Sequence, residues 1–165
     1  MFLLDTDIVW QLRGATAADP ALTAWVARQQ RTGLFVSALT LVELGIAADG
    51  MARADKQAGA AVRLWAESRV VSAFEGRVLA VDARVAGRAA RLGHPNLTDG
   101  LIAATALEHG LVLATRTPAA FRATKAKLLD PGSSAASDAD GSQDADWRQA
   151  SRGGPVWLRN LFARG

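Results

Sequence analysis

The chain of 165 residues contains no cysteine and only two histidines, His94 and His109. Disulfide bonds and thiolate metal sites are therefore excluded, and a histidine-rich zinc site is disfavoured. Both histidines are predicted to be surface or turn residues rather than general bases. Any metal site in this chain has to be built from oxygen ligands.

Long apolar runs are missing as well. No stretch approaches the roughly 18 consecutive apolar residues of a membrane-spanning helix, and Asp5 and Asp7 stand where a secretory signal would carry basic residues. We therefore expect a soluble cytoplasmic protein without membrane contact. The absence of a glycine-rich P-loop or Rossmann motif disfavours a nucleotide cofactor. The five tryptophans are too scattered to predict a base-stacking platform.

What the chain does have is enough apolar sequence for one core. Half of its residues are hydrophobic, and its length is that of one domain. The net charge of +3 and the isoelectric point of about 10.2 mildly favour a polyanionic partner.

The composition changes near residue 132, where Ser, Ala, Asp and Gly begin to dominate without apolar periodicity. We therefore predict a folded domain over 1–131 and a disordered tail over 132–165. The amphipathic pattern over 156–162 leaves a second interpretation open, a small helix that docks on this chain or on a partner.

Strand-like and helix-like segments alternate along the folded domain. Strands are predicted at 3–4, 34–36, 78–81, 111–115 and 126–129, and helices at 21–30, from 37 or 40 through residue 43, within 52–74, at 83–92, from 97 or 98 to 108, and from 118. Asp19 and Asp82 are predicted to cap helices, and Thr6-Asp7 to cap another that begins near Ile8. The alternation predicts a parallel sheet with helices on both faces.

Three carboxylates lie at or near the ends of these strands. Asp5 follows the first strand, Glu43 lies in the first two turns of the helix after the second, and Asp99 precedes an apolar, alanine-rich helical run. Ligands of parallel α/β sheets bind beyond the carboxyl ends of the strands, so we expect these side chains to meet there. Two carboxylates about 4 Å apart repel by roughly 4 kcal/mol at an effective dielectric near 20. The cluster therefore predicts a divalent cation, and Mg²⁺ or Mn²⁺ suits carboxylate ligands best.

Four segments stand in an order and spacing that a known family shares. They are Leu3-Leu4-Asp5-Thr6-Asp7, Leu41-Val42-Glu43-Leu44, Asp99-Gly100-Leu101-Ile102-Ala103-Ala104-Thr105-Ala106, and Leu113-Ala114-Thr115-Arg116 through Phe121, with Val81-Asp82-x-x-Val85-Ala86 between the second and the third. In this combination the chain resembles the PIN-domain ribonucleases, and among them the VapC-type toxins of the FitB-like group.

The resemblance implies a PIN-like three-layer α/β/α sandwich with a central, mostly parallel sheet, metal-dependent cleavage of RNA, a homodimer and a small cognate antitoxin. It makes Asp5, Glu43 and Asp99 three acids of a catalytic quartet, with Asp5 and Asp99 as ligands of Mg²⁺ or Mn²⁺. The family pattern Thr-Arg-Asn-x-x-Asp-Phe is broken here, because Thr117 stands at the Asn and Ala120 at the final Asp. Ala120 cannot bind a cation.

Five further residues are candidates for the surroundings of the metal or for substrate contact: Thr6, Asp7, Thr115, Arg116 and Thr117. Arg116 and Thr115 are expected near a phosphate or ribose, although an ion pair with a nearby acid explains Arg116 equally well. Thr6 either orients a metal ligand or only caps a helix. Asp7 is either a cap or an acid behind the metal ligands.

The sequence thus predicts a metal-dependent endoribonuclease that acts as the toxin of a type II toxin–antitoxin pair. Ala120 leaves a second interpretation, a catalytically impaired PIN domain that binds RNA or an antitoxin-like partner without efficient cleavage. A metal-dependent DNA nuclease of the same fold is a third.

Overall fold

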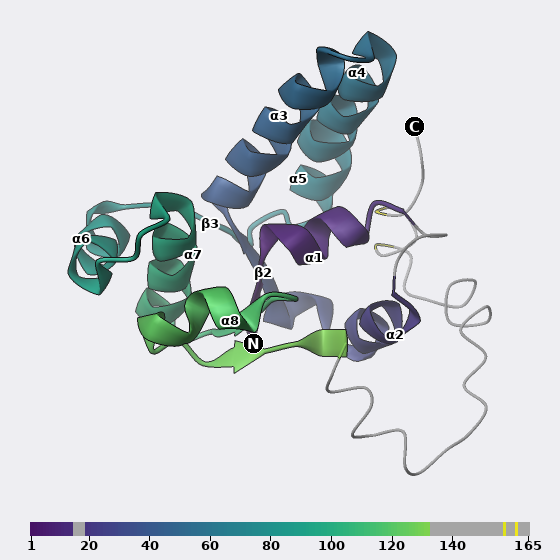
Figure 1. Ribbon diagram of the computed structural model, residues 1–165. Coiled ribbons are helices and arrows are strands. Elements are labelled where there is room, and N and C mark those ends of the chain that lie inside the picture. The colour runs from purple at the N-terminus through teal and green to yellow at the C-terminus, as the bar shows by residue number, and fades with distance from the viewer. Residues whose placement is uncertain (15–18, 133–156, 158–160, 162–165) are drawn as a thin grey trace.

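The computed structural model describes residues 1–14, 19–132, 157 and 161. Within this part of the chain, five short strands form one sheet in the order β3-β2-β1-β4-β5 (Figure 1). The strands are β1 (Phe2–Leu4), β2 (Leu34–Ser37), β3 (Val78–Leu79), β4 (Val112–Ala114) and β5 (Leu128–Leu129). Every pairing between neighbours is parallel, so the predicted parallel sheet is confirmed.

Helices connect the strands. They are α1 (Thr6–Gln11), α2 (Pro20–Arg28), α3 (Ala38–Ala52), α4 (Lys56–Leu64), α5 (Val71–Ala73), α6 (Ala83–Leu92), α7 (Leu97–Glu108) and α8 (Pro118–Phe121), with 3-10 turns η1 (Arg31–Gly33) and η3 (Arg122–Thr124) and a π-helical segment η2 (Trp65–Val70) that joins α4 to α5. Asp19 and Asp82 cap α2 and α6 as predicted. None of the helices described is long and apolar enough to cross a membrane.

The helices cover both faces of the sheet, so β1 is buried on both sides. Leu3 and Leu4 point to opposite faces, and both are fully buried. Leu4 packs with side chains of α1, α2, α3 and η2, whereas Leu3 packs with side chains of α7 and α8. On the outer side of α7, α6 packs through Val85 and Ala89. The expected three-layer α/β/α sandwich is therefore confirmed.

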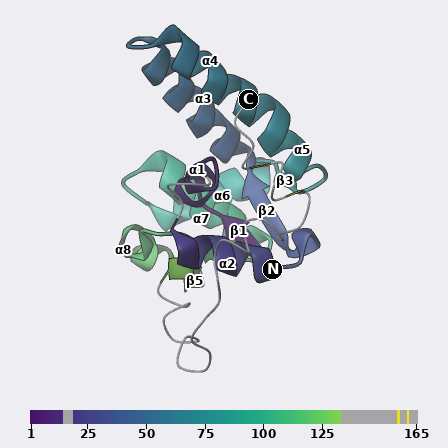
Figure 2. The same ribbon diagram turned by 90° about the vertical axis from the view of Figure 1, so that its right-hand side faces the viewer.

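The helices α3 and α4 form a hairpin that projects away from the sheet (Figures 1 and 2). The two helices come into close contact at Gly59, where an added Cβ would lie 2.5 Å from the Cβ of Ala52. Only glycine fits this approach without displacing the backbone. The end of α3 nearest the sheet carries Glu43, so the hairpin fixes one wall of the predicted site.

The start of α1 corrects the sequence prediction. The helix begins at Thr6 rather than near Ile8, and its N-cap is Asp5 rather than the Thr6-Asp7 pair. The reason is that β1 turns into α1 without a loop, so Asp5 is the last extended residue and its Oδ1 accepts the Thr6 amide at 2.8 Å.

Two residues of the predicted tail contact the domain. Leu161 is fully buried in the core that α1, α2 and α3 share, and its carbonyl oxygen accepts a 2.9 Å hydrogen bond from the indole Nε1 of Trp65. Trp157 packs against the same core. The prediction of disorder for the rest of the tail falls outside the described residues.

Replacing Leu161 by alanine is expected to lower the free energy of unfolding by about 2–5 kcal/mol, because the cavity forms beside Trp65 in a packed core. Leu64→Ala is the matched control, since Leu64 is 60% exposed and its loss costs roughly 0.5 kcal/mol or less. Urea denaturation measures both. Equal stability of the Leu161 variant and the wild type would show that Leu161 does not pack in this core as described.

Candidate active site

The strand order places a site at the carboxyl ends of β1 and β4. From β1 the chain builds β2 and β3 on one side, then crosses to build β4 and β5 on the other. Such a switch point is where parallel α/β sheets bind their ligands. Asp5 follows β1 and Thr115 follows β4, and the Asp5 amide donates to the carbonyl of Ala114 at 2.9 Å. Glu43 lies in the second turn of α3 and Asp99 in the first turn of α7, the ends of these helices that lie nearest this edge.

Asp5 is the buried carboxylate of the site, with 7% of its surface exposed. Its Oδ1 accepts the Thr6 amide, and its Oδ2 accepts the hydroxyl of Thr115 at 2.7 Å. Burial, aided by the charges of Asp7 and Glu43, raises the pKa of Asp5 to about 7 although both hydrogen bonds oppose the rise. These hydrogen-bond donors are neutral, so a divalent cation nearby would stabilise the ionised carboxylate.

Glu43 reaches the same place from α3. The hydroxyl of Thr6 donates to its Oε2 and lies 3.4 Å from the hydroxyl of Thr40. Burial raises the pKa of Glu43, the hydrogen bond from Thr6 lowers it, and the charges of Asp99 and Asp7 raise it again. Thr6 therefore orients the carboxylate of Glu43, and the predicted capping role falls to Asp5.

Asp99 lies in the first turn of α7 and is partly buried. The side chain of Asn96 caps this helix by accepting the amides of Thr98 and Asp99 at 2.9 and 3.1 Å. The positive end of the helix dipole stabilises an ionised carboxylate here by about 0.3–1 kcal/mol. The structure thus brings Asp99 to the same edge as Glu43, from a segment 56 positions further along the chain.

Asp7 and Arg116 lie beside this group. The backbone amide of Arg116 donates to Oδ2 of Asp7 at 3.0 Å, and burial raises the pKa of Asp7 while this hydrogen bond opposes the rise. The guanidinium of Arg116 forms ion pairs with Asp19 and Asp130, both at 3.0 Å. Of the two roles predicted for Arg116, the structure shows the ion pair.

Thr115 links β4 to the site. Its fully buried hydroxyl lies 3.3 Å from the hydroxyl of Thr117 and accepts the Thr117 amide at 3.1 Å. Thr117 itself is exposed and precedes α8, on which Ala120 lies. The methyl group of Ala120 offers no oxygen ligand, so α8 contributes no carboxylate to this edge.

His94 is the site neighbour that the sequence did not reveal. Its Nε2 lies 2.9 Å from the carbonyl oxygen of Ala120, and its ring stacks on Phe121 at 6.3 Å. Hydrogen bonds from the His94 ring to two backbone carbonyls raise its pKa; the bond to Ala120 has the larger effect and the bond to Asn96 the smaller. The charge of Asp99 adds to the rise. His94 was predicted to be a surface or turn residue, and its Nδ1 lies 2.8 Å from the carbonyl oxygen of Asn96 in such a turn. The contact with Ala120 was missed, because it joins residues 26 positions apart that share no sequence pattern.

The chemistry of this donor set fits a hard divalent cation. All the donors are oxygens, Asp5 is buried without a cationic partner among its contacts, and Oδ1 of Asp7 is buried without a hydrogen-bond partner. Among the residues that the structure describes, no three acidic or histidine side chains stand close enough to enclose one ion.

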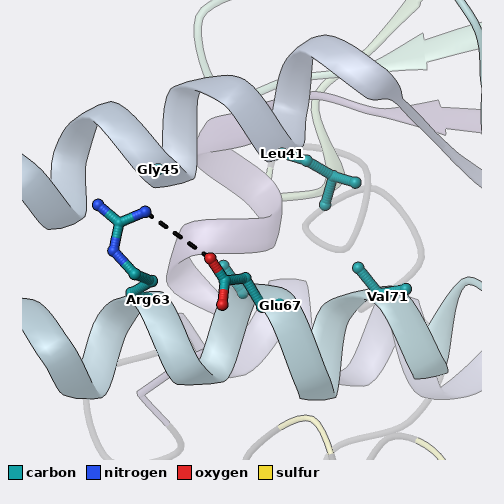
Figure 3. A pocket seen from close by; sticks show the side chains of 6 residues that line it. Leu41, Gly45, Arg63, Glu67 and Val71 are labelled. Atoms are coloured by element: carbon teal, nitrogen blue, oxygen red, sulfur yellow. Dashed lines mark ion pairs between the residues drawn. The ribbon is translucent and has the colours of Figure 1, made fainter.

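A cleft of about 160 Å³ lies apart from the carboxylates, between α3 and the helix formed by α4, η2 and α5 (Figure 3). Its lining consists of Leu41, Gly45, Arg63, Ala66, Glu67 and Val71. Arg63 and Glu67 form an ion pair of 3.7 Å beside the apolar side chains. This lining suits an apolar protein side chain better than a phosphate.

The fold and the site define a class: a three-layer α/β/α protein with a buried aspartate at the switch point of its parallel sheet and further acids near the same edge. The family model of the PIN domain matches residues 2–126. The chain therefore belongs to the PIN domain family. The VapC ribonuclease Y4jK of Sinorhizobium fredii is 33% identical over 139 residues, which cover 79% of this chain and 97% of the relative. The toxin FitB of Neisseria gonorrhoeae is 30% identical over 140 residues, with coverages of 79% and 98%.

Solved structures agree with this assignment. The crystal structure of FitAcB from Neisseria gonorrhoeae matches with a TM-score of 0.70 at 27% identity and covers 79% of this chain and 98% of that one. The structure of FitAB bound to an IR36 DNA fragment matches with a TM-score of 0.68 at 26% identity, with coverages of 80% and 96%. The predicted resemblance to VapC- and FitB-like PIN proteins is confirmed.

Proposed function

We propose that this protein is a divalent-metal-dependent endoribonuclease and the toxin of a toxin–antitoxin pair that acts in the cytoplasm. The observation that carries the proposal is that Glu43 acts electrostatically on Asp5, and Asp99 on Glu43, near the carboxyl edge of the sheet. The similarity to proteins named as a ribonuclease and a toxin supports it.

In this proposal Asp5 and Asp99 hold a Mg²⁺ or Mn²⁺ ion. When bound, such an ion supplies positive charge to a phosphate and makes a nearby water more acidic. The protein contributes orientation, because Thr6 and Thr115 fix the carboxylate of Asp5. Glu43, held by the hydroxyl of Thr6, accepts the proton of the attacking water, and burial of its carboxyl favours that proton transfer by raising its pKa.

The substrate class is tested by digesting single-stranded RNA and single-stranded DNA of the same sequence with the purified protein. Internal cleavage of RNA in Mg²⁺ or Mn²⁺, absent in EDTA, is the expected result. Cleavage of the DNA at a similar rate would replace the proposal by a DNA nuclease.

The second candidate function is RNA or antitoxin binding without efficient cleavage, and Ala120 is the observation that favours it. Ala120→Asp distinguishes the two. A large gain in Mn²⁺-dependent RNA cleavage would show that the natural protein is impaired, whereas an unchanged rate in an already active protein would exclude impairment.

We also propose that the chain forms a homodimer through α3. Val42 and Ile46 are 53% and 65% exposed, and they lie one helical turn apart on the projecting hairpin. Apolar side chains that gather on a surface in this way are typical of protein interfaces. Ile46→Glu is expected to turn the dimer into a monomer in light scattering, while Leu64→Glu on α4 leaves its mass unchanged. A dimer that persists in the Ile46 variant would exclude this face.

The partner in the toxin–antitoxin pair is proposed to be a small antitoxin protein. The cleft between α3 and the α4–η2–α5 helix (Figure 3) supports this, because its volume of about 160 Å³ and its apolar lining can receive side chains of a bound peptide. The similar solved structures, FitAcB and FitAB, give the precedent for a complex. Co-purification with the product of an adjacent small reading frame would test it, and the toxin proposal requires that this product suppresses RNA cleavage.

A further inference from the structure

Asp7 carries a carboxylate oxygen that the site described so far does not use. Its Oδ2 accepts the backbone amide of Arg116, whereas its Oδ1 is buried and has no hydrogen-bond partner. Among the buried side-chain polar atoms of the described residues, this oxygen is the one left without a partner. Native proteins seldom leave a buried acceptor unpaired, and an absent ion is one of the reasons when they do.

The carboxylate of Asp7 belongs to the same electrostatic group as the catalytic acids. Asp7 follows Asp5 by two residues and lies in the first turn of α1. Its carboxylate lies close enough to those of Asp5 and Glu43 to interact with the charges of both. Asp7 therefore adds negative charge to the edge of the sheet where a cation is expected.

The position of Asp7 is fixed through Arg116. The guanidinium of Arg116 forms ion pairs with Asp19 and Asp130. Gly132 packs against it so closely that a Cβ added to this glycine would lie 1.4 Å from Nη1 of Arg116. The side chain of Arg116 is thus anchored, and the backbone amide of the same residue donates to Asp7. That amide requires an acceptor and keeps Oδ2 of Asp7, so Oδ1 is the oxygen left for another ligand.

We propose that Asp7 supplies to the metal centre the carboxylate that Ala120 lacks. This inference rests on the proposed function, because it requires a divalent cation held by Asp5 and Asp99. In this arrangement Oδ2 stays on the Arg116 amide and Oδ1 turns to the cation. Arg116 is then a positioning residue that acts through its backbone, and its side chain serves the site by staying paired.

The Asp7→Asn variant tests this with little change of shape. The Arg116 amide still needs an acceptor, so the asparagine gives it the carbonyl oxygen and presents its NH₂ group where Oδ1 stood. An NH₂ group is a donor and cannot bind a cation. Loss of one ligand is therefore expected to weaken Mn²⁺ binding by about tenfold or more.

The experiment is a Mn²⁺ titration of the full-length protein, followed by electron paramagnetic resonance of the free ion. It compares the wild type with Asp7→Asn, Asp5→Asn and the exposed cap variant Asp82→Asn, and thermal unfolding in EDTA checks that each variant is folded. Asp7→Asn and Asp5→Asn are expected to bind Mn²⁺ more weakly, and Asp82→Asn to bind it as the wild type does. Adding Ala120→Asp to Asp7→Asn is expected to restore binding.

The outcomes separate the inference from the function on which it rests. Unchanged binding by Asp7→Asn together with weakened binding by Asp5→Asn would overturn the role of Asp7 alone. Failure of Ala120→Asp to restore binding would overturn the claim that the two positions serve one ion. Unchanged binding by Asp5→Asn, or no binding by the wild type, would overturn the metal centre and the proposed function together.

Discussion

Asp99→Asn is expected to abolish growth arrest on induction of the gene and to slow RNA cleavage by more than about a hundredfold. The amide that replaces the carboxylate cannot supply the charge that a divalent cation needs from the first turn of α7. Because the side chain is only partly buried and the substitution keeps its shape, the variant should fold as the wild type does. Induced cultures and a cleavage assay with purified protein measure the two effects.

The control for Asp99→Asn is Asp82→Asn. Asp82 caps α6 through the amide of Val85, and asparagine caps a helix as well as aspartate does. The control variant should arrest growth and cleave RNA at the rate of the wild type. An Asp99 variant that is folded and arrests growth equally well would remove Asp99 from the site.

Asp5→Asn is expected to stabilise the metal-free protein above pH 7 while abolishing cleavage. Burial, with the nearby charges of Asp7 and Glu43, raises the pKa of Asp5 from 3.8 to about 7. The folded protein therefore binds a proton that the unfolded chain has already released, and stability falls as the pH rises from about 4 to about 7. This rise in the pKa of Asp5 corresponds to a loss of roughly 4 kcal/mol in the free energy of unfolding.

Denaturation in EDTA between pH 4 and pH 8 measures this effect. The wild type should lose stability over this range, whereas Asp5→Asn should keep only the weaker dependence that Asp7 and Glu43 cause through their own raised pKa values. Adding Mn²⁺ at pH 8 should restore stability to the wild type and have little effect on the variant. An equal pH dependence of stability in both proteins, or a variant less stable than the wild type at pH 8, would mean that the ionised carboxylate of Asp5 does not destabilise the fold.

The order of the elements could be predicted because each leaves a local pattern. The helix at 83–92 was predicted with its bounds and its cap Asp82, and the alternation of strands and helices was enough for the parallel sheet. The expectation that Asp5 and Asp99 share one edge of the sheet rests on topology alone, since the carboxyl ends of parallel strands lie on one side. The start of α1 was wrong because Asp5, Thr6 and Asp7 are all good caps, and only the absence of a loop after β1 selects the first.

The surroundings of the site depend on contacts between distant segments, which leave no local pattern. The ion pairs of Arg116 join it to Asp19, the N-cap of α2, and to Asp130, which follows β5. The contact of His94 with Ala120 is of the same kind, and so is the unpaired oxygen of Asp7. Residue type restricted these side chains to a few roles, and the packing of the helices on the sheet selected among them.

Crystals soaked in Mn²⁺ give the most direct test of the central claim, which is that carboxylates from β1–α1, α3 and α7 form one metal centre. Anomalous diffraction locates the ion without reference to activity. We expect a peak bounded by the carboxylates of Asp5 and Asp99, with Glu43 beside it. A peak elsewhere, or none at a saturating concentration of Mn²⁺, would contradict it.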